Sequence, residues 1–440
     1  MIIKFTLSNW TSFRDTVEFS MIASREKQHR ERLAAIDKYG VKVLPVAAIY
    51  GGNASGKTNL ISALDFLKWM VTDGPKDENQ IPVMPFLLDE AKDLASTFHL
   101  EILVDDTIYE FSLTLDKDQI IEEKLTEIRS RSEKVLFLRT AEEGGKIELH
   151  DSLPDQDFLK FAFRGTRSNQ LFINNTVSQK IDTFRPVYDW FKKTLTLIGP
   201  SSYYDGFNFL TVQDHPLNQL VNNILSQLDT GVQRLGTEDI PQGASSFNSD
   251  TKKELMEEIK PGDSKTYITS TSRERLIVSR KDNELLVKKI VSFHHDAEGK
   301  DVQFDMEMES DGTLRSFDLI PAFVALSLPK SEYVFVIDEL DRSLHSLLTR
   351  QLLEFYFDHC NAAHRSQLIF TTHDLSLIDQ ELFRRDELWA TERNYDGVTS
   401  LFSFGEFNEN RKDTDLRKAY KQGRMGGIPR LSSIDAQEAE

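Results

Sequence analysis

Cysteine and long apolar runs are almost absent from this sequence, and both shortages limit what the protein can be. Cys360 is the one cysteine among 440 residues, which excludes an internal disulfide and is typical of a reducing compartment. No stretch approaches the ~20 consecutive apolar residues of a membrane-spanning helix. Residues 1–20 alternate apolar and polar side chains and lack the apolar core of a signal peptide. We therefore expect a cytoplasmic protein with no membrane partner.

Positive charge is also scarce. The chain has 53 Lys and Arg against 71 Asp and Glu, a formal net charge of −18, which argues against an extensive DNA-binding surface because phosphate contacts depend on basic side chains. Segment 411–430 is an exception, with seven Lys and Arg against two Asp. Such a run is most often a solvated terminal helix. The other interpretation is a contact with nucleic acid or an acidic partner.

The sequence contains no internal repeat and no sustained heptads, so a long coiled-coil arm is not expected. Apolar residues make up 39% and charged residues 28% of the chain, proportions that allow a packed core. The length fits two or three domains, or one large head with an insertion.

A glycine-rich segment carries the strongest functional pattern. Residues 51–58 read GGNASGKT, between the apolar run 43–49 and the helix-like stretch 59–70. Strand, glycine-rich loop and helix are the context of a phosphate-binding loop, in which backbone N–H groups and the helix N-terminus face phosphate oxygens. Lys57 would reach the β- and γ-phosphates and Thr58 would hold Mg²⁺. The predicted nucleotide-binding residues are Gly51, Asn53, Ser55, Gly56, Lys57, Thr58 and Asn59.

The base is not specified by this loop. No NKxD-like guanine-binding sequence is evident, so ATP with Mg²⁺ is the predicted ligand.

Alternation of apolar and polar residues predicts antiparallel strands over 98–104 and 108–115, continuing to residue 138. The character changes at 157–260, where helical spacing with irregular links predicts a mainly helical insertion. The expected fold class is α/β, an ATPase head with an antiparallel β subdomain. Its expected parts are the N-terminal part of the head at 1–156, the insertion at 157–260, the C-terminal part at 261–405 and a basic tail at 406–440.

Two further apolar runs end in ionisable side chains. Residues 333–337 lead into Asp338 and Glu339, the pattern of a buried parallel strand that delivers two carboxylates at its carboxyl end. Asp338 would hold Mg²⁺, and Glu339 would polarise the attacking water. Residues 368–370 lead to His373, which would touch the γ-phosphate or that water. Strand ends with such residues are often purely structural, but the phosphate loop favours the catalytic interpretation. The predicted catalytic residues are Lys57, Glu339 and His373.

The order of these motifs resembles the ABC-type ATPase heads of the SMC, RecF and OLD group. Between the phosphate loop and Asp338 stands the segment 309–313, which reads ESDGT. In this resemblance Ser310 and Gly312 correspond to the signature motif, Asp341 to the D-loop and His373 to the switch histidine.

The resemblance implies an assembly as well as a fold. The signature segment opens a helix, and the apolar spacing of 314–326 fits one, although Pro321 should kink it. The helix N-terminus would donate N–H groups to the γ-phosphate bound by a second head. We therefore expect a homodimer or higher homo-oligomer in which each ATP lies between two chains.

A closer resemblance rests on four segments: LSNWTSF at 7–13, ESDGT at 309–313, RDELW at 385–389 and YKQGRMGGIP at 420–429. They are similar to the ABC-type ATPases of bacterial abortive-infection and anti-phage systems, such as AbiL-type proteins and the AriA component of PARIS. This resemblance implies a regulatory ATPase that controls a separate effector, a Toprim-like or RloB-like nuclease or toxin. The chain departs from the family at Thr11, where an arginine is common, and offers no assignable Q-loop glutamine among Gln80, Gln119 and Gln170.

Two other functions stay open at this point. One is a RecF-like ATPase of DNA maintenance, and the other is the nucleotide-binding subunit of a transporter, which the long separation between phosphate loop and signature disfavours. The chain after His373 is too short for a Toprim domain of the OLD type, so we do not expect this protein to cut nucleic acid itself.

Overall fold

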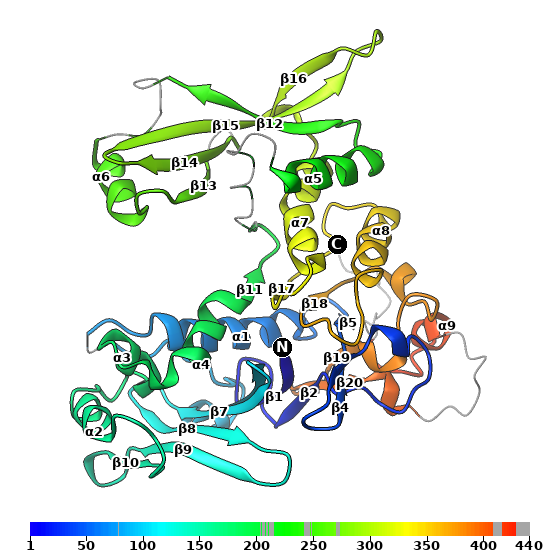
Figure 1. Ribbon diagram of the computed structural model, residues 1–440. Helices are drawn as coiled ribbons and strands as arrows, with labels where there is room; N and C mark the ends of the chain where they lie inside the picture. The colour runs from blue at the N-terminus through cyan, green and yellow to red at the C-terminus, as the bar shows by residue number, and fades with distance from the viewer. Residues whose placement is uncertain are drawn as a thin grey trace, which may run out of the picture. The chain divides into compact units, whose positions relative to one another are not determined.

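The computed structural model divides into two compact units. The first unit is Met1–Pro200, Pro329–Leu340 and Phe357–Glu440, and the second is Ser201–Leu328 and Asp341–Tyr356. Figure 1 follows the chain by colour through both units. The structure describes residues 1–77, 79–202, 204, 207, 210, 215–241, 247, 249–269, 273–407 and 416–427.

A six-stranded sheet forms the centre of the first unit. Its strands have the order β11-β17-β18-β5-β19-β20; all neighbours pair in parallel except β19 and β20. The predicted buried strands are confirmed, because every residue of β5, β17 and β18 is buried. Parallel strands bring their carboxyl ends to one edge, so the residues that follow β5, β17 and β18 gather there. The bounds are β11 Leu195–Ile198, β17 Val334–Ile337, β18 Gln367–Thr371, β5 Val46–Gly51, β19 Leu388–Arg393 and β20 Thr399–Ser403.

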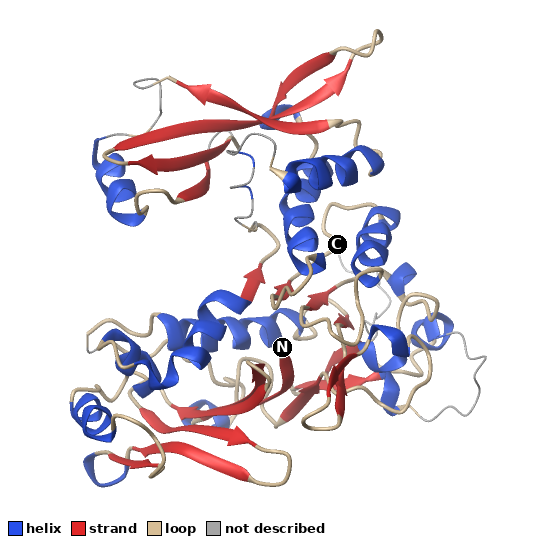
Figure 2. Cartoon of the chain, viewed as in Figure 1, coloured by secondary structure: helices blue, strands red, loops and turns tan. Residues whose placement is uncertain are grey.

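A second, antiparallel sheet of seven strands belongs to the same unit, in the order β10-β9-β8-β7-β6-β1-β2. Figure 2 draws the strands of the chain in red. Its alternating burial confirms the predicted antiparallel strands, since one face packs into the core and the other stays more exposed. The bounds are β1 Ile2–Ser8, β2 Val17–Ser20, β6 Ser96–Val104, β7 Thr107–Leu115, β8 Ile120–Ile128, β9 Glu133–Thr140 and β10 Lys146–Leu149.

Helix α1 begins at Lys57 inside the phosphate loop and ends at Thr72, before Pro75. Its buried face belongs to one large apolar cluster with β1, β6 and β7. The remaining elements of this unit are β3 Ala34–Ile36, β4 Val41–Val43, α2 Gln156–Arg164, α3 Phe172–Ser178, α4 Arg185–Asp189, a π-helix Trp190–Thr194 and α9 Leu416–Lys421.

The second unit contains an antiparallel sheet in the order β12-β15-β14-β13, with β16 paired to β15. Helix α7 starts at Asp311 and runs through Pro321. The bounds are β12 Arg234–Ile240, β13 Ser264–Ile268, β14 Arg275–Lys281, β15 Glu284–His295, β16 Asp301–Asp305, α5 Pro216–Gln227, α6 Ser249–Glu258, α7 Asp311–Ser327 and α8 Ser346–Phe357.

The range 157–260, expected to be a mainly helical insertion, contributes to both units, because the chain passes from the first to the second between Pro200 and Ser201. Helices α2 to α6 lie in it, but so do β11 and β12. Leu195–Ile198 is a short apolar run, and periodicity alone does not separate a buried strand from a helix at that length. Pairing with β17 makes it a strand of the central sheet.

The α/β architecture with a phosphate-loop sheet and an antiparallel subdomain is as predicted. In the described part of the chain, no helix combines the length and apolarity that crossing a bilayer requires. The acidic pair of the tail, Asp413 and Asp415, lies outside the described residues.

Candidate nucleotide-binding site

The phosphate loop is closed tightly against neighbouring strands. Gly51 and Gly56 have φ angles of 151° and 108°, which favour glycine. A Cβ at Gly51 would lie 2.5 Å from the Thr391 hydroxyl, and one at Gly56 would lie 2.7 Å from the Thr399 side chain. Because neither position accepts a side chain, the glycines are required by packing as well as by backbone conformation.

Lys57 is buried, with 6% of its surface exposed. Its Nζ donates to the carbonyl oxygens of Gly51 and Gly52, at 2.9 and 3.1 Å. The ammonium group therefore lies over the mouth of the loop. Phosphate oxygens carry charge and are stronger acceptors than these neutral carbonyls, so the position fits an anionic ligand.

The end of the loop meets the acidic end of β17. Thr58 Oγ1 donates to Asp338 Oδ2 at 2.9 Å. A hydroxyl oxygen beside a carboxylate oxygen is a fitting donor set for Mg²⁺, which binds few protein ligands and completes its shell with water and phosphate. Across the described residues, no group of three or more His, Cys, Asp and Glu is placed to hold a metal.

Thr371, at the end of β18, holds both acids in place, a role that no sequence pattern indicated. Its hydroxyl donates to Asp338 Oδ1 at 2.5 Å and accepts from the backbone N–H of Glu339 at 2.7 Å. Glu339 has a φ of 52°, in the left-handed region, where a non-glycine residue costs about 1–3 kcal/mol. The bond from Thr371 helps to hold that conformation, which sets the direction of the Glu339 side chain.

His373 follows Thr371 by two positions, and its side chain is exposed. Asn53, at the tip of the phosphate loop, is also exposed. Thus the structure places Lys57, Asp338, Glu339 and His373 at the same edge of the central sheet.

Hydroxyl groups from three distant segments support the phosphate loop. Ser55 Oγ and Thr391 Oγ1 are 2.6 Å apart. Thr399 Oγ1 donates to the carbonyl oxygen of Ser55 at 3.0 Å and lies 2.8 Å from Ser12 Oγ. Asn59 donates to the same Ser12 oxygen at 2.7 Å. Of the three hydroxyls that support the loop from outside it, only Ser12 lies in a segment that the sequence analysis singled out, the opening segment 7–13.

Ser310, Gly312 and Asp341, which the resemblance assigns to a signature motif and a D-loop, lie in the second unit. The hydroxyl of Ser310 accepts from the backbone N–H of Thr313 at 3.1 Å and caps helix α7. A Cβ at Gly312 would lie 2.7 Å from the carbonyl oxygen of Ser343, two positions after Asp341. Glycine is therefore required here by the approach of the D-loop backbone.

Helix α7 is anchored by a buried ion pair. Arg275 Nη2 lies 2.8 Å from Asp318 Oδ1 and also donates to the carbonyl oxygen of Leu314 at 3.1 Å. Burial raises the pKa of Asp318 to about 6, and the Arg275 charge opposes that rise. The pair fixes the first turns of α7 against β14.

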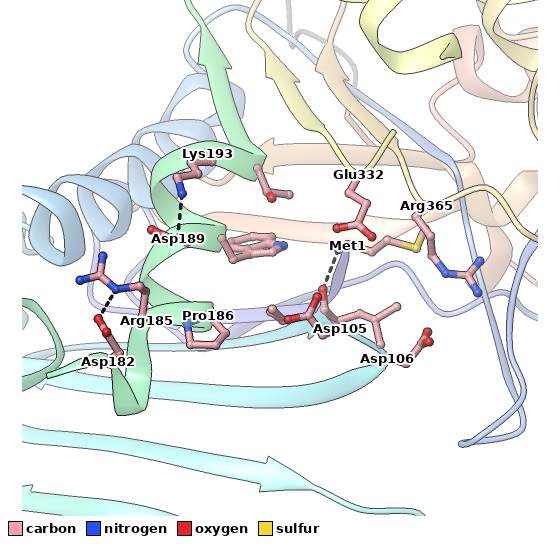
Figure 3. A pocket seen from close by; sticks show the side chains of 14 residues that line it. Met1, Asp105, Asp106, Asp182, Arg185, Pro186, Asp189, Lys193, Glu332 and Arg365 are labelled. Carbon is pink, nitrogen blue, oxygen red and sulfur yellow. Dashed lines mark hydrogen bonds and ion pairs between the residues drawn. The ribbon is translucent and has the colours of Figure 1, made fainter. Parts of the chain in front are cut away.

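A cavity of about 810 Å³ in the first unit lies at the other edge of the central sheet (Figure 3). Thr194, Glu332 and Arg365 line it, and each stands just before β11, β17 or β18. Much of its charged lining is paired internally; for example, Lys193 contacts Asp189 at 2.9 Å (Figure 3). No phosphate-loop residue lines this cavity.

Hydrogen-bond partners are present for Thr11, where the family often has an arginine, and for two of the candidate Q-loop glutamines. The backbone N–H of Thr11 donates to the carbonyl oxygen of Met84 at 2.6 Å. Gln80 donates to Asp118 and Gln170 to Asn174, at 2.9 and 3.1 Å.

Comparison with known proteins gives one family match. The family model described as "AAA domain, putative AbiEii toxin, Type IV TA system" matches residues 46–379. No curated protein sequence matches significantly. The SMC head domain from Thermotoga maritima is 15% identical with a TM-score of 0.37, over 91% of this chain and 98% of that chain. The SmcHead bound to the C-winged helix domain of ScpA is 12% identical with a TM-score of 0.39, over 91% and 97%.

Proposed function

The chain belongs to the AAA domain family described as "putative AbiEii toxin, Type IV TA system", and from this premise we propose that it binds Mg²⁺ and ATP at the phosphate loop and hydrolyses the ATP. One observation carries the proposal: the bond of 2.9 Å between Thr58 and Asp338, which joins two motifs 280 positions apart. It supports the proposal because a hydroxyl beside a carboxylate is a pair of oxygen ligands that suits a phosphate-bound Mg²⁺.

Each residue at this edge has a distinct task. Lys57 and the loop N–H groups bind the phosphate oxygens. Thr58 and Asp338 would hold Mg²⁺, and the ion would neutralise phosphate charge. Glu339 accepts a hydrogen bond from the attacking water and orients it in line with the γ-phosphate. Thr371 keeps Asp338 and Glu339 in place.

Two substitutions test this assignment. Lys57→Ala should lose ATP binding, whereas Glu339→Gln should bind ATP but lose turnover. Matched controls are Lys76→Ala and Glu133→Gln, which alter exposed side chains of the same unit. Turnover measured by phosphate release and binding measured by calorimetry separate the two steps. Wild-type turnover in both site variants would reject the site.

Hydrolysis depends on a second copy of the chain in this proposal, with Ser310 of one copy facing the nucleotide of the other. The support is that Ser310 is exposed at the N-terminus of α7 and that Gly312 and the D-loop are packed together. Glu339→Gln with ATP should therefore form a stable dimer, detected by sedimentation.

A mixing experiment tests the shared site more directly. Lys57→Ala and Ser310→Arg should each be inactive alone. In a mixed dimer, one site contains both changes and the other contains neither. An equal mixture should then recover about a quarter of wild-type turnover, if copies pair at random and sites act independently. No recovery, with both variants folded, would contradict a site made from two copies.

The biological role we propose is regulation of a separate effector in anti-phage defence. Its support is the family match together with the opening segment 7–13 and the RDELW segment 385–389. A host carrying the complete locus should lose protection against phage when Lys57→Ala or Glu339→Gln replaces the wild type. Unchanged protection, combined with hydrolysis that DNA stimulates in a salt-dependent manner, would instead favour a DNA-maintenance ATPase.

A further inference from the structure

A buried carboxylate stands directly before the signature serine. The side chain of Glu309 is 6% exposed. Its Oε1 accepts from Ser292 Oγ at 2.5 Å and lies 2.8 Å from His294 Nε2. Ser292 and His294 are on strand β15, so these contacts tie the sheet of the second unit to the start of α7.

The chemistry of the cluster makes it a firm anchor. Because a carboxylate oxygen accepts, the ring nitrogen of His294 that faces it carries the hydrogen. Bonds to an ionised acceptor are shorter and stronger than neutral ones. Both donors are held in place, since Ser292 is fully buried and the His294 ring packs on Phe304 with centroids 4.4 Å apart.

Only one peptide unit separates this anchor from the signature residue. The N–H of Glu309 donates to the carbonyl oxygen of Met306 at 3.2 Å, which closes a turn. Ser310 follows and caps α7 through Thr313. With Glu309 fixed on one side and the helix on the other, Ser310 has little freedom to move.

We infer that Ser292 and His294 are positioning residues, which act through Glu309 to hold Ser310 in the orientation required at the nucleotide of a second copy. This inference rests on the proposed function. A displacement of about 1 Å at a group that contacts a reacting ligand costs about a hundredfold in rate. Loss of the anchor should therefore lower turnover without altering the phosphate loop, which belongs to the first unit.

Paired variants separate positioning from packing. His294→Phe keeps a ring against Phe304 but removes the N–H donor, whereas His294→Gln keeps a donor. The control is His295→Phe, at the next position of β15, where the side chain is 47% exposed and contacts Asp301 at 3.3 Å. We expect a drop of about tenfold or more in kcat for His294→Phe, a drop under about threefold for His294→Gln, and no change for His295→Phe.

ATP affinity is the second readout. It should stay at the wild-type value in His294→Phe, because Lys57 and its loop are untouched. Ser292→Ala removes one hydroxyl and should likewise lower kcat while leaving ATP affinity unchanged. It replaces His294→Phe in the experiment if that variant does not fold. Equal losses of affinity and kcat, or no loss in either variant, would overturn the inference.

Ser310→Ala separates a failure of this inference from a failure of the proposed function on which it rests. If Ser310→Ala retains full turnover, the site shared between copies is wrong. If Ser310→Ala loses turnover while His294→Phe and Ser292→Ala keep it, the shared site stands and the positioning role is overturned.

Discussion

Glu387 offers a sharp test of the electrostatics inside the first unit. Its side chain is fully buried; Oε2 accepts from the backbone N–H of Arg384 at 2.8 Å, and Oε1 has no hydrogen-bond partner among the described residues. Burial raises the pKa of Glu387 to about 8. Arg384 does not neutralise it, because its guanidinium is paired with Asp386 at 2.8 and 2.7 Å. We predict that Glu387→Gln stabilises the protein at alkaline pH.

The magnitude follows from the difference between the folded and unfolded pKa values. The unfolded carboxyl titrates near 4.5 and the folded one near 8, so the folded state holds the proton more tightly. The stability that this provides is complete below pH 4.5 and is lost as the pH rises to about 8. Each pH unit in this window costs about 1.4 kcal/mol, about 5 kcal/mol in total. Gln carries no charge at any pH, so the Glu387→Gln variant does not lose this stability as the pH rises.

Urea denaturation at pH 5, 7 and 8.5 measures the effect. All four tryptophans, Trp10, Trp69, Trp190 and Trp389, lie in the first unit, so their fluorescence reports the unfolding of that unit alone. The free energy of unfolding of Glu387→Gln relative to wild type should rise steadily with pH. Glu381→Gln, an exposed control three residues before Arg384, should follow the wild type throughout. Parallel pH profiles for Glu387→Gln and wild type would refute the reasoning.

Four further predictions address the site and its supports. Thr371→Val removes the bonds to Asp338 and Glu339 and should lower kcat about tenfold or more, with a smaller change in ATP affinity; an unchanged kcat would contradict its role. Gly56→Ala, at a φ of 108° with Thr399 at 2.7 Å, should lower ATP affinity at least about tenfold by calorimetry; wild-type affinity would contradict the required close packing. Gly312→Ala places a Cβ 2.7 Å from Ser343 O and should destabilise α7 by about 1–3 kcal/mol; unchanged amide exchange there would be inconsistent with that contact. Glu123→Ala removes the carboxylate that accepts from Arg139 and from the N–H groups of Phe172 and Ile173, while Arg139 keeps the carbonyl oxygens of Gln170 and Arg167; it should cost about 3–5 kcal/mol by tryptophan fluorescence, and a cost below about 1 kcal/mol would show that water replaces the carboxylate.

The sequence predicted the parts of the site that are continuous in the chain. The phosphate loop is spelled out between a buried strand and a helix, and both elements appear where its pattern indicates. Asp338 and Glu339 follow a run of apolar residues too short for a helix, so a buried strand was the natural interpretation. Parallel pairing then brings these strand ends to one edge.

The supporting side chains could not be predicted, because their roles depend on contacts across the fold. Thr371, Thr391 and Thr399 are ordinary strand residues in the sequence, and β-branched residues are common in strands for packing reasons alone. Their hydroxyls become functional only through pairings with Asp338, Ser55 and Ser12. The strand β11 was missed for a related reason, since its pairing partner lies more than a hundred positions away.

Strand β17, which leads into Asp338 and Glu339, has an unusual connection along the chain. The segment Pro329–Leu340, which contains β17, Asp338 and Glu339, belongs to the first unit but is continuous with the second unit at both ends. Its neighbour β11 ends at Ile198, three positions before Ser201, where the chain first enters the second unit. Glu339, which has a left-handed conformation and which we propose as catalytic, is therefore two positions from Asp341, where the chain re-enters the second unit. A change in the second unit would therefore reach Glu339 through two positions of backbone, whereas Lys57 lies more than a hundred positions before Ser201, where that unit begins. Regulation through the second unit should therefore change kcat more than ATP affinity.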